Sequence, residues 1–221
     1  MSQQHSANSE NRELPARLRG AVRSLAGVMG HVTPYRLWQA PFAERKLAPV
    51  WRHNNLTGIR RVLDVGCGPG TNARHFTHVN YVGIDNNPEY VAWARRRYGD
   101  RFLVADVCSD TSLSGFRFDF VLVNSFLHHV STPDVRAILI RLARQLTDDG
   151  HVHILDLVMP ERPCLPRLLA RFDRGDYPRP LAEWHALFTE AFEPVLFEPY
   201  PLGIFGFTLW NMVYFKGRRK D

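Results

Sequence analysis

Three acidic residues each end a short apolar run of the sequence, and a glycine-rich segment follows the first. Asp64, Asp85 and Asp106 close the runs VLD, YVGID and RFLVAD, and residues 66–70 read Gly-Cys-Gly-Pro-Gly. Glycines let a backbone pass close under a ligand and supply the dihedral angles of a tight turn. The nicotinamide fingerprint GxGxxG requires glycine or alanine where this chain has Thr71. The pattern predicts a ligand loop that differs from a dinucleotide site.

The acids define the ligand that such a loop would hold. In an open parallel sheet the crevice lies at the carboxyl ends of the strands, where all three carboxylates would meet. Carboxylates repel a pyrophosphate but suit a cation that also carries a ribose and an amine. S-adenosylmethionine combines a sulfonium, an ammonium, a ribose diol and an adenine amine. We therefore expect S-adenosylmethionine as the cofactor and S-adenosylhomocysteine as its product.

The elements that would position these residues are strands alternating with helices. Five short apolar runs follow one another from Arg60 onward, separated by segments with helical periodicity. This alternation is typical of a parallel sheet covered on both faces. The five runs are RRVLDV, YVGID, RFLVAD, FDFVLVNS and HVHILDL.

Capping signals locate the helices of this α/β fold. Asn87 before Pro88, with Gly99 after YVAWARRRY, predicts one helix, and Ser131 or Thr132 before Pro133 begins another that would end before Gly150. A late helix is expected around residues 181–192. The β-rich runs EPVLFEPY and GFTLWNMVYFKG, joined by Pro201-Leu202-Gly203, predict an antiparallel C-terminal hairpin.

Three regions are expected along the chain. Residues 1–12 are polar and aperiodic, as in a disordered tail. Residues 13–55 show helical spacing broken by Pro34 and Pro41, which predicts a helical N-terminal cap or lid. Residues 56–221 would form the cofactor-binding domain.

These motifs, in this order, resemble the class I S-adenosylmethionine-dependent methyltransferases of the small-molecule type. The resemblance covers residues from about 60 to 158 and is carried by DVGCGPGT, GIDNN, VADV and LHHV. It implies a Rossmann-like sheet of seven mostly parallel strands with a reversed final hairpin, and helices on both faces. It also implies cofactor contacts from Asp64, Gly66, Cys67 and Gly68 to the methionine portion, from Asp85 and Asn86 to the ribose, from Asp106 and Val107 to the adenine, and from the Asn124 backbone to the amino-acid moiety.

Related folds bring their first helices over the cofactor, and the resemblance therefore implies a lid. We expect Tyr35 to be the lid residue that contacts the cofactor.

Two histidines and one acid suit proton transfer. His128 and His129 follow the fourth predicted strand and Asp156 ends the fifth, so an imidazole and a carboxylate can meet at the crevice. A histidine oriented by an acid can accept the proton of a hydroxyl. The sequence resembles natural-product and sugar O-methyltransferases here. Because consecutive strand residues point to opposite sides, only one histidine would face inward, and we favour His129 with His128 as its rival.

Composition bounds the partners. The chain has 221 residues, 45% hydrophobic and 23% charged, as in an ordinary globular domain. Three widely spaced cysteines without a CxxC pair indicate neither a disulfide framework nor zinc, and we expect a metal-free enzyme in the cytoplasm. No apolar run reaches the roughly 20 residues of a membrane helix. The expected reaction is O-methylation of a small organic acceptor.

Other functions remain open at this stage. A net charge of +6 favours anionic partners, so an RNA methyltransferase is one alternative, but the chain has Asn124-Ser125-Phe126-Leu127 where such enzymes carry an NPPY-type tetrapeptide. We do not expect nucleic acid as the partner. A lipid or quinone methyltransferase and a non-catalytic partner protein are further alternatives. The sequence leaves open whether the chain is a monomer or a homodimer.

Overall fold

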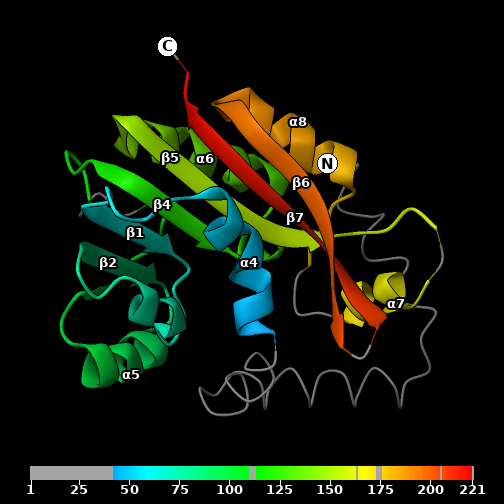
Figure 1. Ribbon diagram of the computed structural model, residues 1–221, viewed down its shortest axis with the longest axis horizontal. Helices are drawn as coiled ribbons and strands as arrows, with labels where there is room; N and C mark the ends of the chain where they lie inside the picture. The colour runs from blue at the N-terminus through cyan, green and yellow to red at the C-terminus, as the bar shows by residue number, and fades with distance from the viewer. Residues whose placement is uncertain (1–41, 110–112, 163, 173–175, 205, 221) are drawn as a thin grey trace. The chain divides into compact units, whose positions relative to one another are not determined.

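The computed structural model describes residues 42–109, 113–162, 164–172, 176–204 and 206–220. Residues 40–221 form one compact unit (Figure 1). The predicted tail, most of the predicted cap and Tyr35 lie outside the described residues. The described end of the cap region is helix α4 (Ala43–His53), and its Leu47 and Val50 are buried against the sheet.

A seven-stranded sheet forms the centre of the described chain, in the order β3-β2-β1-β4-β5-β7-β6. β1 to β5 pair in parallel, whereas β7 runs antiparallel to both β5 and β6. This confirms the predicted fold class, including the reversed final hairpin. The strands are β1 (Arg61–Val65), β2 (Asn80–Asp85), β3 (Phe102–Val104), β4 (Phe118–Asn124), β5 (Leu146–Val158), β6 (Phe192–Ile204) and β7 (Phe207–Arg219).

Helices cover both faces of the sheet, which is why its central strands are apolar on both sides. In β1, Leu63 and Val65 pack in a cluster with α6 and α8, whereas Val62 packs in a second cluster with α4 and α5 (Figure 1). The α-helices after α4 are α5 (Pro88–Tyr98), α6 (Thr132–Gln145), α7 (Leu165–Phe172) and α8 (Leu181–Ala191), and two short 3₁₀ helices are η1 (Thr71–His75) and η2 (Leu127–His129).

The predicted capping signals act as expected. The Asn87 side chain accepts hydrogen bonds from the backbone N–H groups of Glu89 and Tyr90 at the start of α5, and Gly99 ends that helix. Ser131 caps α6 through the N–H of Asp134. These caps define where α5 begins after β2 and where α6 begins after η2.

Two boundaries differ from the sequence prediction. Helix α6 ends at Gln145, before Gly150 as predicted, but β5 begins at Leu146 and not at His151, so Gly150 lies inside the strand. The predicted connection at residues 201–203 is part of β6, and the hairpin turns between Ile204 and Phe207 instead. Proline signalled a break, but β6 is the edge strand, where a residue without an N–H is tolerated.

Glycine is required where the two strands of this hairpin cross closely. A Cβ atom on Gly203 would lie 1.8 Å from the carbonyl oxygen of Phe207.

None of the described helices is long and apolar enough to cross a membrane.

Candidate active site

The glycine loop leaves the carboxyl end of β1 in a conformation that suits glycine. Gly66, Gly68 and Gly70 have φ angles of 67°, 54° and 75°, in the left-handed region. A Cβ atom on Gly66 would also lie 2.9 Å from the Phe126 ring, so the loop touches the segment that follows β4. The helix predicted after the loop is the short 3₁₀ helix η1, because β2 begins at Asn80 and leaves little room for a longer one.

Asp85 ties this loop to the end of β2. Its carboxylate accepts hydrogen bonds from the N–H of Gly68 at 2.8 Å and from the N–H of Asn87 at 2.9 Å. Burial raises the pKa of Asp85, and the two backbone bonds oppose that rise. The neighbouring Asn86 is exposed. The loop and the predicted ribose acid thus form one hydrogen-bonded unit.

Asp64 lies beneath the loop and is fully buried. Its Oδ2 atom accepts hydrogen bonds from the Tyr81 hydroxyl at 2.7 Å and from the Asn72 amide at 3.1 Å. Its Oδ1 atom has no hydrogen-bond partner. Burial raises the pKa of Asp64 to about 7, and the charge of Asp85 adds to this effect. A buried carboxylate oxygen with no partner is costly unless a ligand or water satisfies it.

The remaining predicted cofactor residues line the same edge of the sheet in different environments. Asp106 is exposed, and hydrogen bonds from the Cys108 N–H and the Ser109 hydroxyl lower its pKa. Val107 beside it is 9% exposed. Cys67 is buried, and burial raises the pKa of its thiol, so it is a packing residue of the loop and not a thiolate. Asn124 is the last residue of β4 and is partly buried.

His128 and Asp156 form a buried pair at the ends of β4 and β5. The Nδ1 atom of His128 lies 2.6 Å from Oδ1 of Asp156, and the two side chains are 3% and 0% exposed. Burial opposes ionisation of Asp156. The charge and hydrogen bond of His128, with the backbone N–H groups of Leu157 and Leu127, nevertheless hold the pKa of Asp156 below its ordinary value. An ionised acid therefore fixes this imidazole with Nδ1–H toward it.

His129 is exposed and lies beside His128, with ring centroids 4.1 Å apart. The structure thus pairs His128, the rival candidate in the sequence prediction, with Asp156. The alternation rule applied to these residues assumes extended backbone, but Ser125 has a φ of 54° and residues 127–129 form the 3₁₀ helix η2. With three residues per turn, neighbours in such a helix do not alternate between two faces.

Arg179 is a buried residue of this region that the sequence analysis missed. Its side chain is 3% exposed in its ion pair with Glu183, and its Cζ lies 4.8 Å from the Trp184 ring centroid. The guanidinium donates to the carbonyl oxygens of Leu127 at 3.1 Å and Val130 at 2.7 Å. It therefore fixes both ends of the segment that carries His128.

The signal for Arg179 in the sequence is its position between two prolines, Pro178 and Pro180. Proline favours an extended conformation in the residue before it. The extended segment runs beside β5, where Arg179 bridges Val158, and the N–H of Tyr177 donates to the carbonyl of His128 at 3.0 Å. Such a segment can be expected from the prolines, but its partner cannot.

Within the described part of the chain, no group of three or more histidine, cysteine, aspartate or glutamate side chains could hold a metal ion. The metal-free mechanism stays a prediction.

Comparisons with known proteins bear on this site. The family model described as "Methyltransferase domain" matches residues 62–150. The chain is 32% identical over 112 residues to trans-aconitate 2-methyltransferase of Delftia acidovorans, an alignment that covers 48% of this chain and 40% of that protein. It is 28% identical over 141 residues to an uncharacterized methyltransferase, YcgJ, of Bacillus subtilis, covering 58% and 55%. The chain thus aligns with about half the length of these curated relatives or less.

A solved structure shares the fold over nearly its whole length. The N-methyltransferase NodS of Bradyrhizobium japonicum, in complex with S-adenosylhomocysteine, superposes with a TM-score of 0.70 at 17% identity, covering 90% of this chain and 98% of that one.

The fold is that of the class I S-adenosylmethionine-dependent methyltransferases, and the predicted resemblance to this class is confirmed. Residues 62–150, from β1 into β5, are the part of the chain that matches the methyltransferase-domain model.

Proposed function

We propose that the protein is an S-adenosylmethionine-dependent methyltransferase that methylates a hydroxyl of a small organic acceptor. One observation carries the proposal: His128, which forms a buried pair with Asp156 of β5, lies on the segment that touches the glycine loop through Phe126 and Gly66. A general base next to a cofactor loop is the arrangement that hydroxyl methylation requires.

The loop and the acids fit the cofactor chemically. The unpartnered Oδ1 of Asp64 is a buried acceptor suited to the ammonium of the methionine portion. Asp85 keeps lone pairs beyond its two backbone bonds and suits the ribose diol. Asp106 and Val107 would flank the adenine. Gly66, Cys67, Gly68, Asn86 and Asn124 would supply the remaining contacts. When bound, S-adenosylmethionine supplies the methyl group on a positively charged sulfur.

Nε2 of His128 would take the proton of the substrate hydroxyl, because the Nδ1–H group of His128 is hydrogen-bonded to Asp156. In this arrangement His129 would contact the methyl acceptor but would not take its proton. Arg179 would be a positioning residue, since its hydrogen bonds end on backbone carbonyls on either side of the histidines. Alignment of the acceptor with the methyl group would supply much of the rate, as several kcal/mol can come from orientation alone.

The acceptor class can be tested directly. A panel of small hydroxyl, amine and carboxylate compounds is incubated with the protein and S-adenosylmethionine, and S-adenosylhomocysteine release is measured. Turnover of hydroxyl compounds that depends on His128 would support the full proposal. Turnover of amines alone would contradict the hydroxyl acceptor. Failure to bind S-adenosylhomocysteine in calorimetry would contradict the cofactor.

A further inference from the structure

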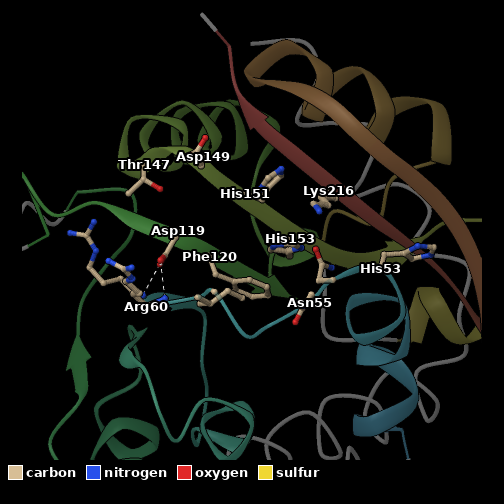
Figure 2. Close-up of a pocket in the computed structure, with 14 residues that line it drawn as sticks. His53, Asn55, Arg60, Asp119, Phe120, Thr147, Asp149, His151, His153 and Lys216 are labelled. Atoms are coloured by element: carbon tan, nitrogen blue, oxygen red, sulfur yellow. Dashed lines mark hydrogen bonds between the residues drawn. The ribbon is translucent and has the colours of Figure 1, made fainter.

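A cavity of about 510 Å³ opens at the edge of the sheet opposite the glycine loop. It lies at the amino ends of β1 and β4 and along β5 and β7, beneath the connection from α4 to β1 (Figure 2). Its volume is within the range of small-molecule sites, about 300 to 1,000 Å³. Its lining residues are His53, Asn54, Asn55, Gly58, Ile59, Arg60, Arg61, Asp119, Phe120, Thr147, Asp149, His151, His153 and Lys216.

A fixed imidazole stands in the wall of this cavity. His153 stacks on Phe120 with ring centroids 3.9 Å apart, and its Nδ1 lies 2.9 Å from the Tyr214 hydroxyl. That hydroxyl already accepts a hydrogen bond from the Asn54 amide at 2.8 Å, so its own proton goes to Nδ1. The ring proton of His153 is therefore on Nε2, which has no acceptor among the described residues.

Lys216 lies directly across from His153 in the antiparallel pairing of β5 and β7. Residues opposite one another in such a pair have neighbouring side chains. Figure 2 shows His151, His153 and Lys216 together on this wall. No carboxylate or carbonyl of the described residues pairs with the Lys216 ammonium. Two unused donors, one of them charged, thus stand side by side.

The other charged groups of the cavity do not neutralise this ammonium. The Asp119 carboxylate accepts hydrogen bonds from the backbone N–H groups of Arg60 and Arg61 at 2.8 and 2.6 Å. His53 is engaged with Glu198 at 2.7 Å. Asp149 is exposed, and its charge acts on His151, whose pKa it raises. Burial and the charge of Lys216 both lower the pKa values of His151 and His153, so the ammonium makes this wall unfavourable for further positive charge. Arg60 and Arg61, which are exposed, are lining residues that add further positive charge.

We propose that this cavity binds the phosphate or carboxylate group of a small molecule, held by Lys216 and by the Nε2–H of His153. An oxyanion accepts hydrogen bonds from both donors and supplies the countercharge that Lys216 lacks. The cavity is larger than a single oxyanion requires, and its Asn55 and Thr147 side chains offer polar contacts to the rest of such a molecule. This site is distinct from the methyl-transfer site, since the two lie at opposite ends of the strands.

The experiment uses two probes, inorganic phosphate and succinate, at constant ionic strength set with sodium chloride. The melting temperature and the pKa of His151, followed by NMR, are measured against probe concentration. We expect a saturable rise in both, because a bound anion stabilises the folded state and favours protonated imidazole. Lys216→Met should lower the affinity for whichever probe binds by at least about tenfold. Lys216→Arg should retain most of that affinity. Lys220→Met is the matched control, since Lys220 lies outside the cavity and donates to the carbonyl of Glu190.

Saturation by phosphate alone identifies a phosphate ligand, and saturation by succinate alone identifies a carboxylate ligand; either supports the proposal. Equal affinity in the wild-type and Lys216→Met proteins would overturn it. So would an effect that sodium chloride reproduces, or one that Lys220→Met diminishes as much as Lys216→Met, because each indicates diffuse surface charge. If a single-stranded oligonucleotide binds and neither small probe does, the proposal is overturned, and this surface binds nucleic acid instead.

Discussion

The two ends of the parallel strands carry opposite chemistry in this protein. At the carboxyl ends, Asp64 and Asp85 lie under and beside a loop that presents backbone N–H groups. At the amino ends, Lys216 and His153 line a cavity in which the carboxylate of Asp119 accepts two hydrogen bonds from backbone N–H groups. The first edge is arranged for a cation with polar substituents and the second for an anion. A net charge of +6 describes neither edge, so the position of a charge along the sheet is more informative than the sum.

The largest expected effect is the loss of turnover when His128, at the carboxyl ends of the strands, is replaced. We expect His128→Ala to lower turnover by about 10² to 10⁴ because a general base is lost. Affinity for S-adenosylhomocysteine in calorimetry should stay unchanged. His129→Ala is the control and should retain turnover, since its ring is exposed and the imidazole held 2.6 Å from Asp156 is that of His128. Full turnover of the His128→Ala protein with saturating acceptor would contradict the base role.

The next prediction compares Asp85, at the carboxyl ends of the strands, with Asp119, at their amino ends. Asp85→Ala should weaken S-adenosylhomocysteine binding by at least about tenfold, because a hydrogen bond to a charged group contributes about 1.5 to 3 kcal/mol. Asp119→Ala removes a carboxylate that also accepts two backbone N–H bonds, but at the amino edge. Calorimetry should show normal affinity in that variant. An equal loss in both would mean that Asp85 acts only by holding the backbone.

Two arginines offer a comparison of stability. Arg179→Met leaves buried carbonyls without donors and should lower the free energy of unfolding by about 1 to 3 kcal/mol. Arg60→Met, at the exposed amino edge, should change it by less than about 0.5 kcal/mol. Urea denaturation measures both values. If Arg179 positions His128, turnover of Arg179→Met should also fall at temperatures where the protein remains folded, with KM little changed. Unchanged turnover would limit Arg179 to a structural role.

The smallest effect is a pH dependence at Asp64, whose pKa is raised by burial to about 7. The carboxyl is protonated below this pKa and ionised above it, and the ammonium group of S-adenosylhomocysteine binds the ionised form better. Affinity for S-adenosylhomocysteine should therefore rise with pH, by at most about tenfold from pH 6 to pH 8. Calorimetry at several pH values measures the trend, and Asp64→Asn should flatten it. A trend that persists in that variant would assign the titration to another group.

Much of the carboxyl edge could be predicted because short-range patterns determine it. Apolar runs ending in acids, the glycine spacing and the Asn87-Pro88 cap each act within a few residues. They predicted the parallel strands and the position of three acids at or near the carboxyl ends of these strands. The cavity at the amino ends left no such pattern, since its residues come from segments as distant as Asn54 and Lys216.

The sequence was uninformative where tertiary context decides a local conformation. The left-handed Ser125 and the 3₁₀ turn that follows it rotate His128 toward Asp156, and no residue type in that segment signals this. The pairing of Arg179 with the carbonyls around the histidines depends on contacts across about 50 residues of sequence. The edge position of β6, which tolerates its prolines, is likewise a property of the whole sheet.

Those prolines have a consequence for aggregation. Pro194, Pro199 and Pro201 lie opposite Gly217, Val213 and Asn211 of β7, so the bulge between Pro194 and Leu196 gives all three the same place in the ladder. In an antiparallel pair, residues alternate between facing the partner strand and facing away. Because proline has no backbone N–H, three prolines that share the outward-facing position remove three hydrogen-bond donors from the exposed edge of the sheet. A second copy of the chain, or a misfolded strand, would find an interrupted template there, which protects the long hairpin from edge-to-edge association.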